Sequence, residues 1–385
     1  MSPEAAMRLA LAQARRALGR SFPNPPVGAV VLRGDRVLGR GHTRPAGGPH
    51  AEVVALDSAL RRFGARGVRG ASMAVTLEPC CHEGRTGPCA ALLAQTGLRR
   101  VLVGHIDPHP AVAGRGLRRL RRAGIEVRVG VLDAECRAQH RGFLSVCERG
   151  RPFVTLKLAS SLDGRIATSE GESRWITGEA ARAAVHRLRA RIDAIAVGSG
   201  TALADDPELT ARRGASVTHR PVRVLVDSQL RVPASARLYR GEGQQTWVLC
   251  ARGAPAARRR ALAATGARLL EVPLRGRRLD LRRAMVKLAR AGLTQVLVEG
   301  GGELAAALLR EGLVDELHWF LSNRLLGGDG RPALGPLEVR ALAESYQLED
   351  LRVRRAGDDL HIQGSVRRGV DRRRRGARRE QRKRG

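Results

Sequence analysis

The sequence predicts an α/β protein of two domains. Its 385 residues are more than one compact domain usually holds. Short apolar runs alternate with amphipathic stretches in both halves, as strands and helices do in layered α/β domains. Arg149-Gly150-Arg151-Pro152 interrupts this alternation and marks a junction. We therefore expect one domain over 1–147, a second over 153–366, and a basic, disordered tail over 367–385.

The first domain should open with a helix, because Ser2 suits an N-cap and Pro3 a first helical position. Apolar runs on either side of Arg33-Gly34-Asp35 then predict a hairpin. The alternation that follows predicts a helix over 50–60, a strand over 71–77, a helix over 89–97, a strand over 100–103, a helix over 117–123 and a strand over 126–129.

The second domain repeats this alternation without repeating the sequence of the first. Pro255 should open its helix, since a missing N–H has no consequence there. Apolar runs predict strands over 153–158, 194–197, 222–226, 246–249 and 295–298. Amphipathic stretches predict helices over 179–191, 255–265, 281–291 and 303–311.

Bulk properties limit the classes of partner. No run of 18 or more apolar residues occurs, so we expect no membrane span. The N-terminus lacks a basic stretch followed by an apolar core, which favours the cytoplasm, where cysteines stay reduced and free for metal. The formal charge of +32 invites a nucleic-acid interpretation, but the arginines are spread through every segment and only 3% of residues are aromatic. We expect no nucleic-acid partner.

The tail is the one segment with concentrated charge. From Arg367 to Gly385 it carries eleven basic residues against Asp371 and Glu380. A solvated, disordered tail is the plain interpretation. A weak, salt-sensitive contact with a polyanion is the alternative.

His50, Cys80 and Cys89 predict a catalytic zinc site. One His and two Cys suit zinc, and three protein ligands leave the fourth tetrahedral position open for water. Glu52 stands two positions after His50, and on a helix it would point away from the ligand and toward the open side, where it can move protons. This is the layout of zinc deaminases, in which metal-activated water attacks a ring carbon. A structural zinc or unlinked residues are the alternatives.

The neighbouring cysteines are expected to play no part in this site. Cys81 is adjacent to Cys80, and neighbouring residues rarely point at one ion. Cys136, Cys147 and Cys250 have no partner at ligand-like spacing, so we expect buried thiols.

The first half resembles the deaminase half of the RibD-type family of bifunctional riboflavin-biosynthesis enzymes. The resemblance rests on Asn24-Pro25-Pro26-Val27-Gly28, Gly41-His42, His50-Ala51-Glu52 and the string from Thr76 to Cys89. The family usually has Ser where Cys81 stands and Pro where Gly87 stands, and both positions are off the ligands. The resemblance implies a cytidine-deaminase-like three-layer fold, zinc on His50, Cys80 and Cys89, proton transfer by Glu52, and a substrate pocket lined by Asn24, His42, His82, Arg85 and Thr86.

The second half contains a glycine run, Glu299-Gly300-Gly301-Gly302, between a predicted strand and a predicted helix. Glycines let backbone amides approach a phosphate at a helix start, although a turn without any ligand is as common. The run belongs to a longer ordered set, Ser161-Leu162-Asp163-Gly164, Ser173-Arg174-Trp175-Ile176-Thr177, Asp205-Asp206-Pro207 and Asp227-Ser228, that resembles the reductase half of the same family.

This second resemblance implies a dihydrofolate-reductase-like fold and NADPH as cofactor. It implies that substrate is contacted by Ser173, Arg189, Leu209, Arg212 and Glu299. It implies cofactor contacts from Ala159, Trp175, Thr201, Asp205, Ser228, Gly300, Gly301, Gly302, Glu303, Leu304, Ala305, Ala306 and Ala307. Lys157 is a candidate proton donor, with an ordinary ion-paired lysine as the alternative.

The predicted function is zinc-dependent deamination of a phosphoribosyl pyrimidine followed by NADPH-dependent reduction of its ribose, by a homo-oligomer. One rival is a nucleobase or nucleic-acid zinc deaminase with an accessory domain, which would be distinguished by the substrate that loses ammonia. The other is a non-catalytic, zinc-stabilised binding protein, which would not depend on Glu52.

Overall fold

The computed structural model describes residues 1–81, 87–241 and 243–369. They form two compact units. The first comprises 1–153 with the short segments 191–193 and 285–295, and the second comprises 154–190, 194–284 and the described residues from 296 onward. Within this part of the chain, no helix is long and apolar enough to cross a membrane.

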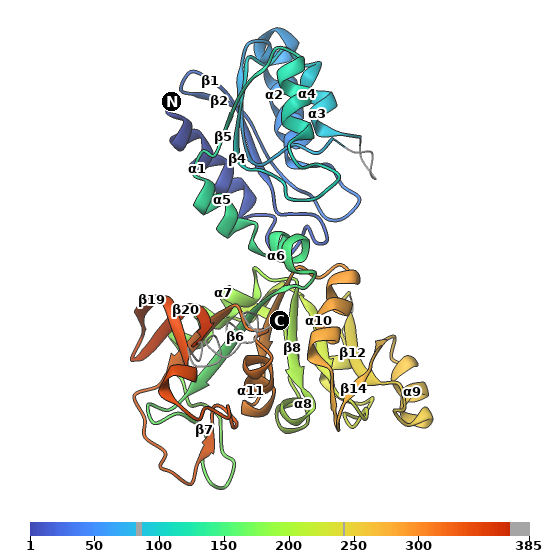
Figure 1. Cartoon of the computed structure of the whole chain (residues 1–385), viewed down its shortest axis with the longest axis vertical. Helices are drawn as coiled ribbons and strands as arrows, with labels where there is room; N and C mark the ends of the chain where they lie inside the picture. The colour runs from blue at the N-terminus through green and yellow to red at the C-terminus, as the bar shows by residue number, and fades with distance from the viewer. Residues whose placement is uncertain (82–86, 242, 370–385) are drawn as a thin grey trace, which may run out of the picture. The chain divides into compact units, whose positions relative to one another are not determined.

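The first unit is built around a five-stranded sheet in the order β2-β1-β3-β4-β5 (Figure 1). β1 pairs antiparallel with β2 and β3, whereas β3, β4 and β5 are parallel. The strands are β1 (Gly28–Arg33), β2 (Arg36–His42), β3 (Ser72–Leu77), β4 (Arg100–His105) and β5 (Glu126–Val129). The helices are α1 (Pro3–Ala14), α2 (Ala51–Val68), α3 (Cys89–Ala94), α4 (Arg115–Arg122), α5 (Asp133–Gln139) and α6 (Arg141–Arg149).

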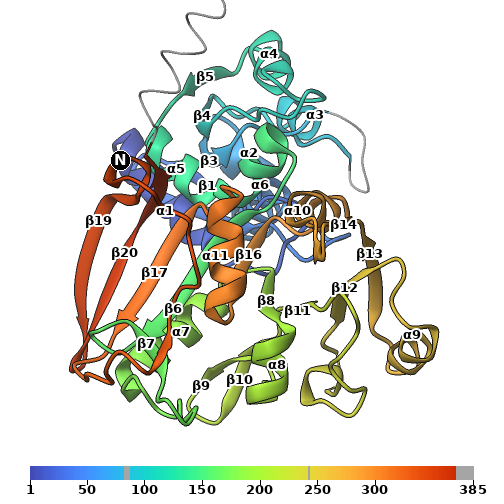
Figure 2. The ribbon, with the colours of Figure 1, turned by 60° about the horizontal axis from the view of Figure 1, so that its bottom comes forward.

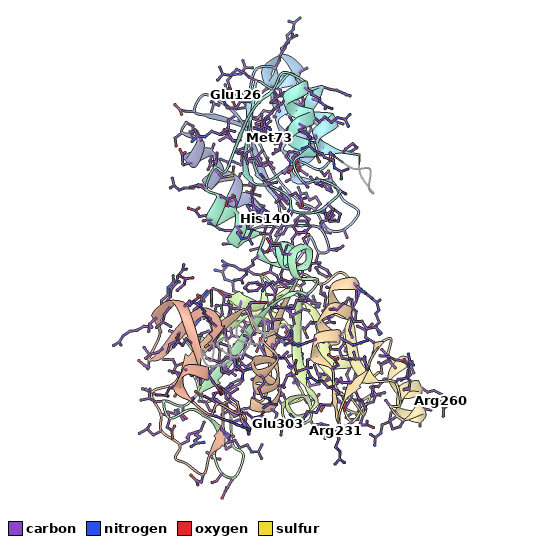
Figure 3. The ribbon with its side chains drawn as sticks, viewed as in Figure 1. Met73, Glu126, His140, Arg231, Arg260 and Glu303 are labelled. Carbon is purple, nitrogen blue, oxygen red and sulfur yellow. The ribbon has the colours of Figure 1, made fainter. Side chains whose placement is uncertain are left out.

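Two apolar cores lie on opposite faces of this sheet, so the unit has three layers. Alternate residues of each strand point to opposite faces. Met73 therefore packs with α2, α3 and α4, while its neighbour Ala74 packs with α1 and α5. Met73 lies in the middle layer of the unit (Figure 3), and both residues are fully buried.

The second unit contains a nine-stranded sheet in the order β13-β12-β11-β8-β16-β6-β17-β20-β19. β13, β12, β11, β8 and β16 pair in parallel, as do β6 and β17. β20 and β19 finish the sheet as a long antiparallel hairpin, visible beside β17 in Figure 2. α7 covers one face there, because its Ala181 and Val185 pack on the buried ring of Phe320 from β17.

From residue 153 onward the strands of the large sheet are β6 (Phe153–Ser160), β8 (Ala194–Gly198), β11 (Val222–Val226), β12 (Thr246–Ala251), β13 (Arg268–Val272), β16 (Gln295–Glu299), β17 (Glu316–Leu321), β19 (Tyr346–Ala356) and β20 (Asp359–Arg368). Short hairpins are made by β7 (Arg165–Ala167) with β18 (Arg331–Pro332), β9 (Ala211–Arg213) with β10 (Ser216–His219), and β14 (Leu274–Arg275) with β15 (Arg278–Leu279). The helices are α7 (Glu179–Arg189), α8 (Ser199–Asp205), α9 (Ala256–Ala263), α10 (Leu281–Arg290) and α11 (Gly302–Arg310), with 3₁₀ turns η1 (Arg237–Tyr239) and η2 (Leu342–Glu344).

Several boundaries differ from the prediction. α2 continues beyond residue 60, where Leu60 and Phe63 still pack on the core, and then reaches Val68 across a kink at Gly64, whose φ is 63°. Pro255 is the N-cap of α9, with an extended ψ of 128°, and not its first helical residue. β20 runs to Arg368, so Arg367 and Arg368 belong to this strand and not to the tail. The rest of the predicted tail, from residue 370, lies outside the described residues.

Candidate active sites

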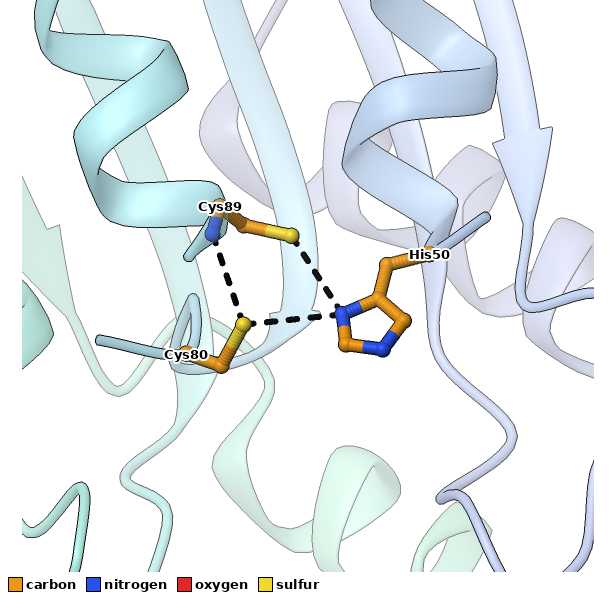
Figure 4. A group of neighbouring side chains, drawn as sticks. All are labelled: His50, Cys80 and Cys89. Carbon is orange, nitrogen blue, oxygen red and sulfur yellow. Dashed lines mark hydrogen bonds between the residues drawn. The ribbon is translucent and has the colours of Figure 1, made fainter. Parts of the chain in front are cut away.

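The three predicted zinc ligands come together in the first unit (Figure 4). His50 is the N-cap of α2, Cys80 follows β3, and Cys89 is the first residue of α3. Nδ1 of His50 lies 3.5 Å from Sγ of Cys80 and 3.4 Å from Sγ of Cys89. All three ligand atoms lie within 4.8 Å of one another. One nitrogen and two sulfurs at this separation fit three corners of a tetrahedral zinc site.

The electrostatics of the cluster distinguish its two thiols, because the hydrogen bond with Cys80 and burial raise the pKa of Cys89. Hydrogen bonds from Cys89 and His50 lower the pKa of the Cys80 thiol, although burial opposes the shift. The backbone N–H of Cys89 also donates to Sγ of Cys80, at 3.4 Å. A thiolate is the form of cysteine that binds metal, so Cys80 is the thiol that its surroundings prepare for a metal ion.

Glu52 lies beside this cluster in the first turn of α2, with 4% of its surface exposed. The expected helical relation between His50 and Glu52 is wrong, because His50 has an extended ψ of 163° and stands just outside the helix. Burial, followed by the charge of Cys80, raises the pKa of Glu52 to about 7. A carboxyl group with a pKa near neutrality can both accept and return a proton.

Glu78 is a supporting residue that the sequence analysis did not single out. It stands two positions before Cys80 and is 3% exposed. Its carboxylate accepts backbone N–H groups from Asp107 at 3.3 Å, Gly114 at 2.9 Å and Leu117 at 3.3 Å. It thereby fixes the Pro79-Cys80 corner against the start of α4. The role of Glu78 is visible only from its burial beside a metal ligand. Burial depends on tertiary structure, so the sequence could not reveal this role.

The predicted pocket residues of this unit are only partly described. His42 lies at the end of the sheet from which Cys80 follows. The end of β2 pairs with the start of β1, where Gly28 opposes His42, and the N–H of Gly28 donates to Oγ1 of Thr76 in β3 at 3.1 Å. Asn24 precedes β1 by four residues, and its contact with substrate stays a prediction. Burial and nearby arginines lower the pKa of His42. His82, Arg85 and Thr86 lie outside the described residues.

The other cysteines stand apart from the cluster. Sγ of Cys81 donates to the carbonyl of Ala111 at 3.3 Å, so its side chain is turned to another loop. Cys136 and Cys250 are buried, as expected, whereas Cys147 is only half-buried.

The second unit contains a cleft of about 1240 Å³. All five predicted substrate residues line it: Ser173, Arg189, Leu209, Arg212 and Glu299. Six of the predicted cofactor residues also line it: Ala159, Trp175, Thr201, Asp205, Gly300 and Gly301. Arg174, Arg182 and Arg213 add positive charge to its wall, which suits the phosphates of a dinucleotide and of a phosphorylated substrate.

The remaining predicted cofactor residues do not line this cleft. Ser228 follows β11, and its carbonyl accepts the N–H of Ala251 at 3.0 Å. Gly302 to Ala307 form the first turns of α11, where Ala305 and Ala306 are buried in the core. The side chain of Glu303 is 86% exposed and visible on the surface in Figure 3. Cofactor contacts from this group remain predictions.

A buried ion pair organises the centre of the cleft. Arg189 binds Glu299 through two hydrogen bonds of 2.7 and 2.8 Å and donates a third, of 3.0 Å, to the carbonyl of Thr210. Burial alone would raise the pKa of Glu299, but the charge and hydrogen bonds of Arg189 lower it, so the carboxylate stays ionised. Lys157 also lines the cleft, and burial lowers its pKa.

Comparison with protein families matches each half of the chain separately. Residues 1–105 match the cytidine and deoxycytidylate deaminase zinc-binding region, and residues 152–362 match the RibD C-terminal domain. The predicted deaminase-like and dihydrofolate-reductase-like folds, in this order, are therefore confirmed.

Whole-chain relatives carry both halves. The riboflavin biosynthesis protein RibD of Aquifex aeolicus is 38% identical over 356 residues, which cover 92% of this chain and 96% of the relative. RibD of Escherichia coli strain K12 is 39% identical over 378 residues, covering 95% and 100%.

Solved structures agree. Acinetobacter baumannii RibD has a TM-score of 0.83 at 36% identity, covering 95% of this chain and 99% of that one. The Thermotoga maritima diaminohydroxyphosphoribosylaminopyrimidine deaminase/5-amino-6-(5-phosphoribosylamino)uracil reductase has a TM-score of 0.80 at 32% identity, covering 95% and 98%. The chain therefore belongs to the RibD family of riboflavin biosynthesis proteins and is a bifunctional enzyme, with a zinc-binding pyrimidine deaminase and an NADPH-dependent reductase.

Proposed function

We propose that the first unit deaminates 2,5-diamino-6-hydroxy-4-(5-phosphoribosylamino)pyrimidine. The second unit then reduces the ribosyl group of the product, giving 5-amino-6-(5-phosphoribitylamino)uracil. The observation that carries the proposal is the cluster of His50, Cys80 and Cys89 with a buried Glu52 beside it. The activities for which the Thermotoga maritima relative is named support this choice of substrate.

In the deamination step, Glu52 transfers protons. Zinc, when bound, supplies the Lewis acidity that makes water nucleophilic at neutral pH. The Glu52 carboxylate takes one proton from the attacking water and passes it to the ring nitrogen. It then takes the second proton, from the hydroxyl group of the adduct, and passes it to the amino group, which leaves as ammonia while the ring carbonyl forms. The pKa of about 7 suits both directions of transfer. Asn24, His42, His82, Arg85 and Thr86 orient the substrate.

In the reduction step, the chain binds and positions the reactants. NADPH, when bound, supplies the hydride for C1′ of the opened ribose. Ser173, Leu209 and Arg212 contact the substrate, and the Arg189–Glu299 pair fixes the centre of the cleft. Lys157 is the candidate proton donor, because burial lowers its pKa toward the range in which it can release a proton.

The test is Glu52→Gln, which keeps the shape of the side chain and removes its proton exchange. We expect zinc to stay bound while ammonia release falls by about 10²- to 10⁴-fold. Reduction of the deaminated intermediate should be unchanged. Glu126→Gln, an exposed carboxylate on β5 of the same unit, is the matched control. Unchanged ammonia release by Glu52→Gln with stoichiometric zinc would refute the role of Glu52.

We also propose that the chain acts as a homo-oligomer in the cytoplasm. The support for assembly is β19, the outer strand of the nine-stranded sheet, in which residues 349–355 are exposed. A long exposed edge strand presents unpaired backbone groups that another chain can cover. Light scattering of the full chain tests the assembly, and a monomer at micromolar concentration would contradict it.

A further inference from the structure

The loop from Asp205 to Arg212 forms one wall of the reductase cleft and holds two backbone conformations that its residues do not favour. Asp206 has φ of 41° and Leu209 has φ of 52°. Left-handed conformations of residues other than glycine cost free energy and persist only where the surroundings enforce them. Asp205, Asp206, Pro207, Leu209 and Arg212 all line the cleft, so the strained turn shapes the binding surface directly.

The group that enforces this turn from behind is Arg223, on β11. Arg223 is 3% exposed and is not among the residues that line the cleft. Its Nε donates to the carbonyl of Glu208 at 3.0 Å, directly before the strained Leu209. Nη1 donates to the carbonyls of Leu238 and Arg240, both at 2.6 Å, and Nη2 donates to Oε1 of Gln244 at 2.8 Å.

Gln244 extends the same network to the second strained residue. Its Nε2 donates to the carbonyl of Leu209 at 3.1 Å and to that of Pro221 at 2.9 Å. Arg223 and Gln244 together therefore hold two successive carbonyls of the loop, those of Glu208 and Leu209. On the other side of the turn, the N–H of Arg237 donates to Oδ1 of Asp206 at 2.7 Å.

Only arginine can make this set of contacts from one buried position. The guanidinium presents five N–H donors in a rigid planar fork, and four of them are used here on acceptors from four different residues. A lysine ammonium is a single point with three donors and cannot span the same acceptors. Burying a guanidinium without satisfied donors is costly, so the network fixes the loop and the arginine together.

We propose that Arg223 is a positioning residue of the reductase, which acts through Gln244 to hold the Asp206–Leu209 turn in its strained, binding-competent form. The proposal rests on the assignment of Leu209 and Arg212 to the substrate and Asp205 to the cofactor. Arg223 itself touches neither reactant. Its effect is to set where the loop places Leu209, Arg212 and Asp205.

Two variants of the full chain test the proposal. Arg223→Lys retains the positive charge and removes the planar guanidinium group with its set of N–H donors. Gln244→Glu keeps the size and the acceptor for Arg223 but removes both donors to Leu209 and Pro221. Arg220→Lys, an exposed arginine three residues before Arg223, is the matched control. For both test variants we expect reductase kcat/KM to fall about 10- to 100-fold, through higher KM for NADPH and the pyrimidine intermediate, with kcat little changed.

A second measurement separates positioning from general stability. Hydrogen–deuterium exchange of residues 203–214 should rise in both variants, while that of β11 and β12 stays as in the unmodified chain. Unchanged KM values and unchanged exchange of 203–214 would overturn the proposal. A rise in exchange throughout β11 and β12 would also overturn it, because Arg223 would then be a general stabiliser. Failure of the unmodified chain to oxidise NADPH with the intermediate would instead refute the proposed function, and the exchange result would still test the loop.

Discussion

His140 connects a helix junction to the strand that leads to the zinc ligands. It lies between α5 and α6 with no exposed surface, at the position labelled in Figure 3. Its Nε2 is 3.0 Å from Oγ1 of Thr76, which also accepts the N–H of Gly28. Among the described residues, its Nδ1 has no hydrogen-bond partner. The buried imidazole of His140 is stable only in its neutral form, because the positive charge of the protonated ring would have no partner.

The stability of the first unit should therefore depend on pH through His140. Burial lowers the pKa of His140 to about 3, from an ordinary value of 6.5. Below pH 6.5 the unfolded chain takes up a proton that the folded chain excludes, so stability is complete above that pH and falls as the pH decreases. Below pH 6.5 the loss in the free energy of unfolding from His140 approaches about 1.4 kcal/mol per pH unit. Urea unfolding followed by circular dichroism at pH 7 and pH 5 measures it, and His140→Gln should remove this part of the slope. An equal slope in His140→Gln would show that other groups cause it.

Two glycines allow helices to lie directly against the sheet of the first unit. A Cβ added at Gly28 would lie 2.0 Å from the carbonyl oxygen of Ala10 in α1. One added at Gly41 would lie 2.2 Å from that of Ala51, the first residue of α2. These contacts are with backbone, which cannot turn away as a flexible side chain can. Gly41 therefore sets the position of the helix whose N-cap is His50.

Gly41→Ala should weaken zinc binding as well as stability. The added methyl group must push the start of α2 outward, at a cost of about 1–3 kcal/mol for overpacking. Because His50 moves with this helix end, we expect faster loss of zinc to a chelator and a lower midpoint of unfolding. Gly253→Ala is the control, since a Cβ there meets nothing within 4 Å. Normal zinc retention in a destabilised Gly41→Ala variant would mean that α2 and the ligand cluster are not coupled.

At the scale of elements, the sequence was informative where strands are buried on both faces. β8 is a continuous apolar run and β11 is apolar except for Arg223, and the predicted ranges differ from the observed ones by no more than one residue. The hairpin of β19 and β20 was missed, because most of β19 is exposed and mixes arginines with scattered leucine and valine. α5 and α6 were missed for a related reason, since each buries few residues and leaves little periodicity.

Across the whole chain, the deaminase and the reductase use separate sets of residues. The metal ligands found among the described residues are in the first unit, whereas the cleft is lined only by residues of the second.

Zinc removal should therefore abolish the deaminase activity alone. Dialysis against dipicolinate should stop ammonia release, and added zinc should restore it. The oxidation of NADPH with the deaminated intermediate, followed by the loss of NADPH absorbance, should persist throughout. Circular dichroism should show that the protein stays folded after zinc is removed. Parallel loss of both activities would show that the reductase depends on the metal site.

The sequence by itself determined the chemistry of the protein. His50, Cys80 and Cys89 are residue types that bind zinc and Glu52 is one that transfers protons, and their order sufficed to predict zinc and deamination. Tertiary structure decided how these groups are held. Three of these arrangements depend on contacts between segments far apart in the chain. Glu78 fixes the loop that carries Cys80, His140 is buried in its neutral form, and Arg223 binds the carbonyl groups of a strained loop. Burial and hydrogen-bond geometry arise only when those segments meet, so no local pattern could reveal them.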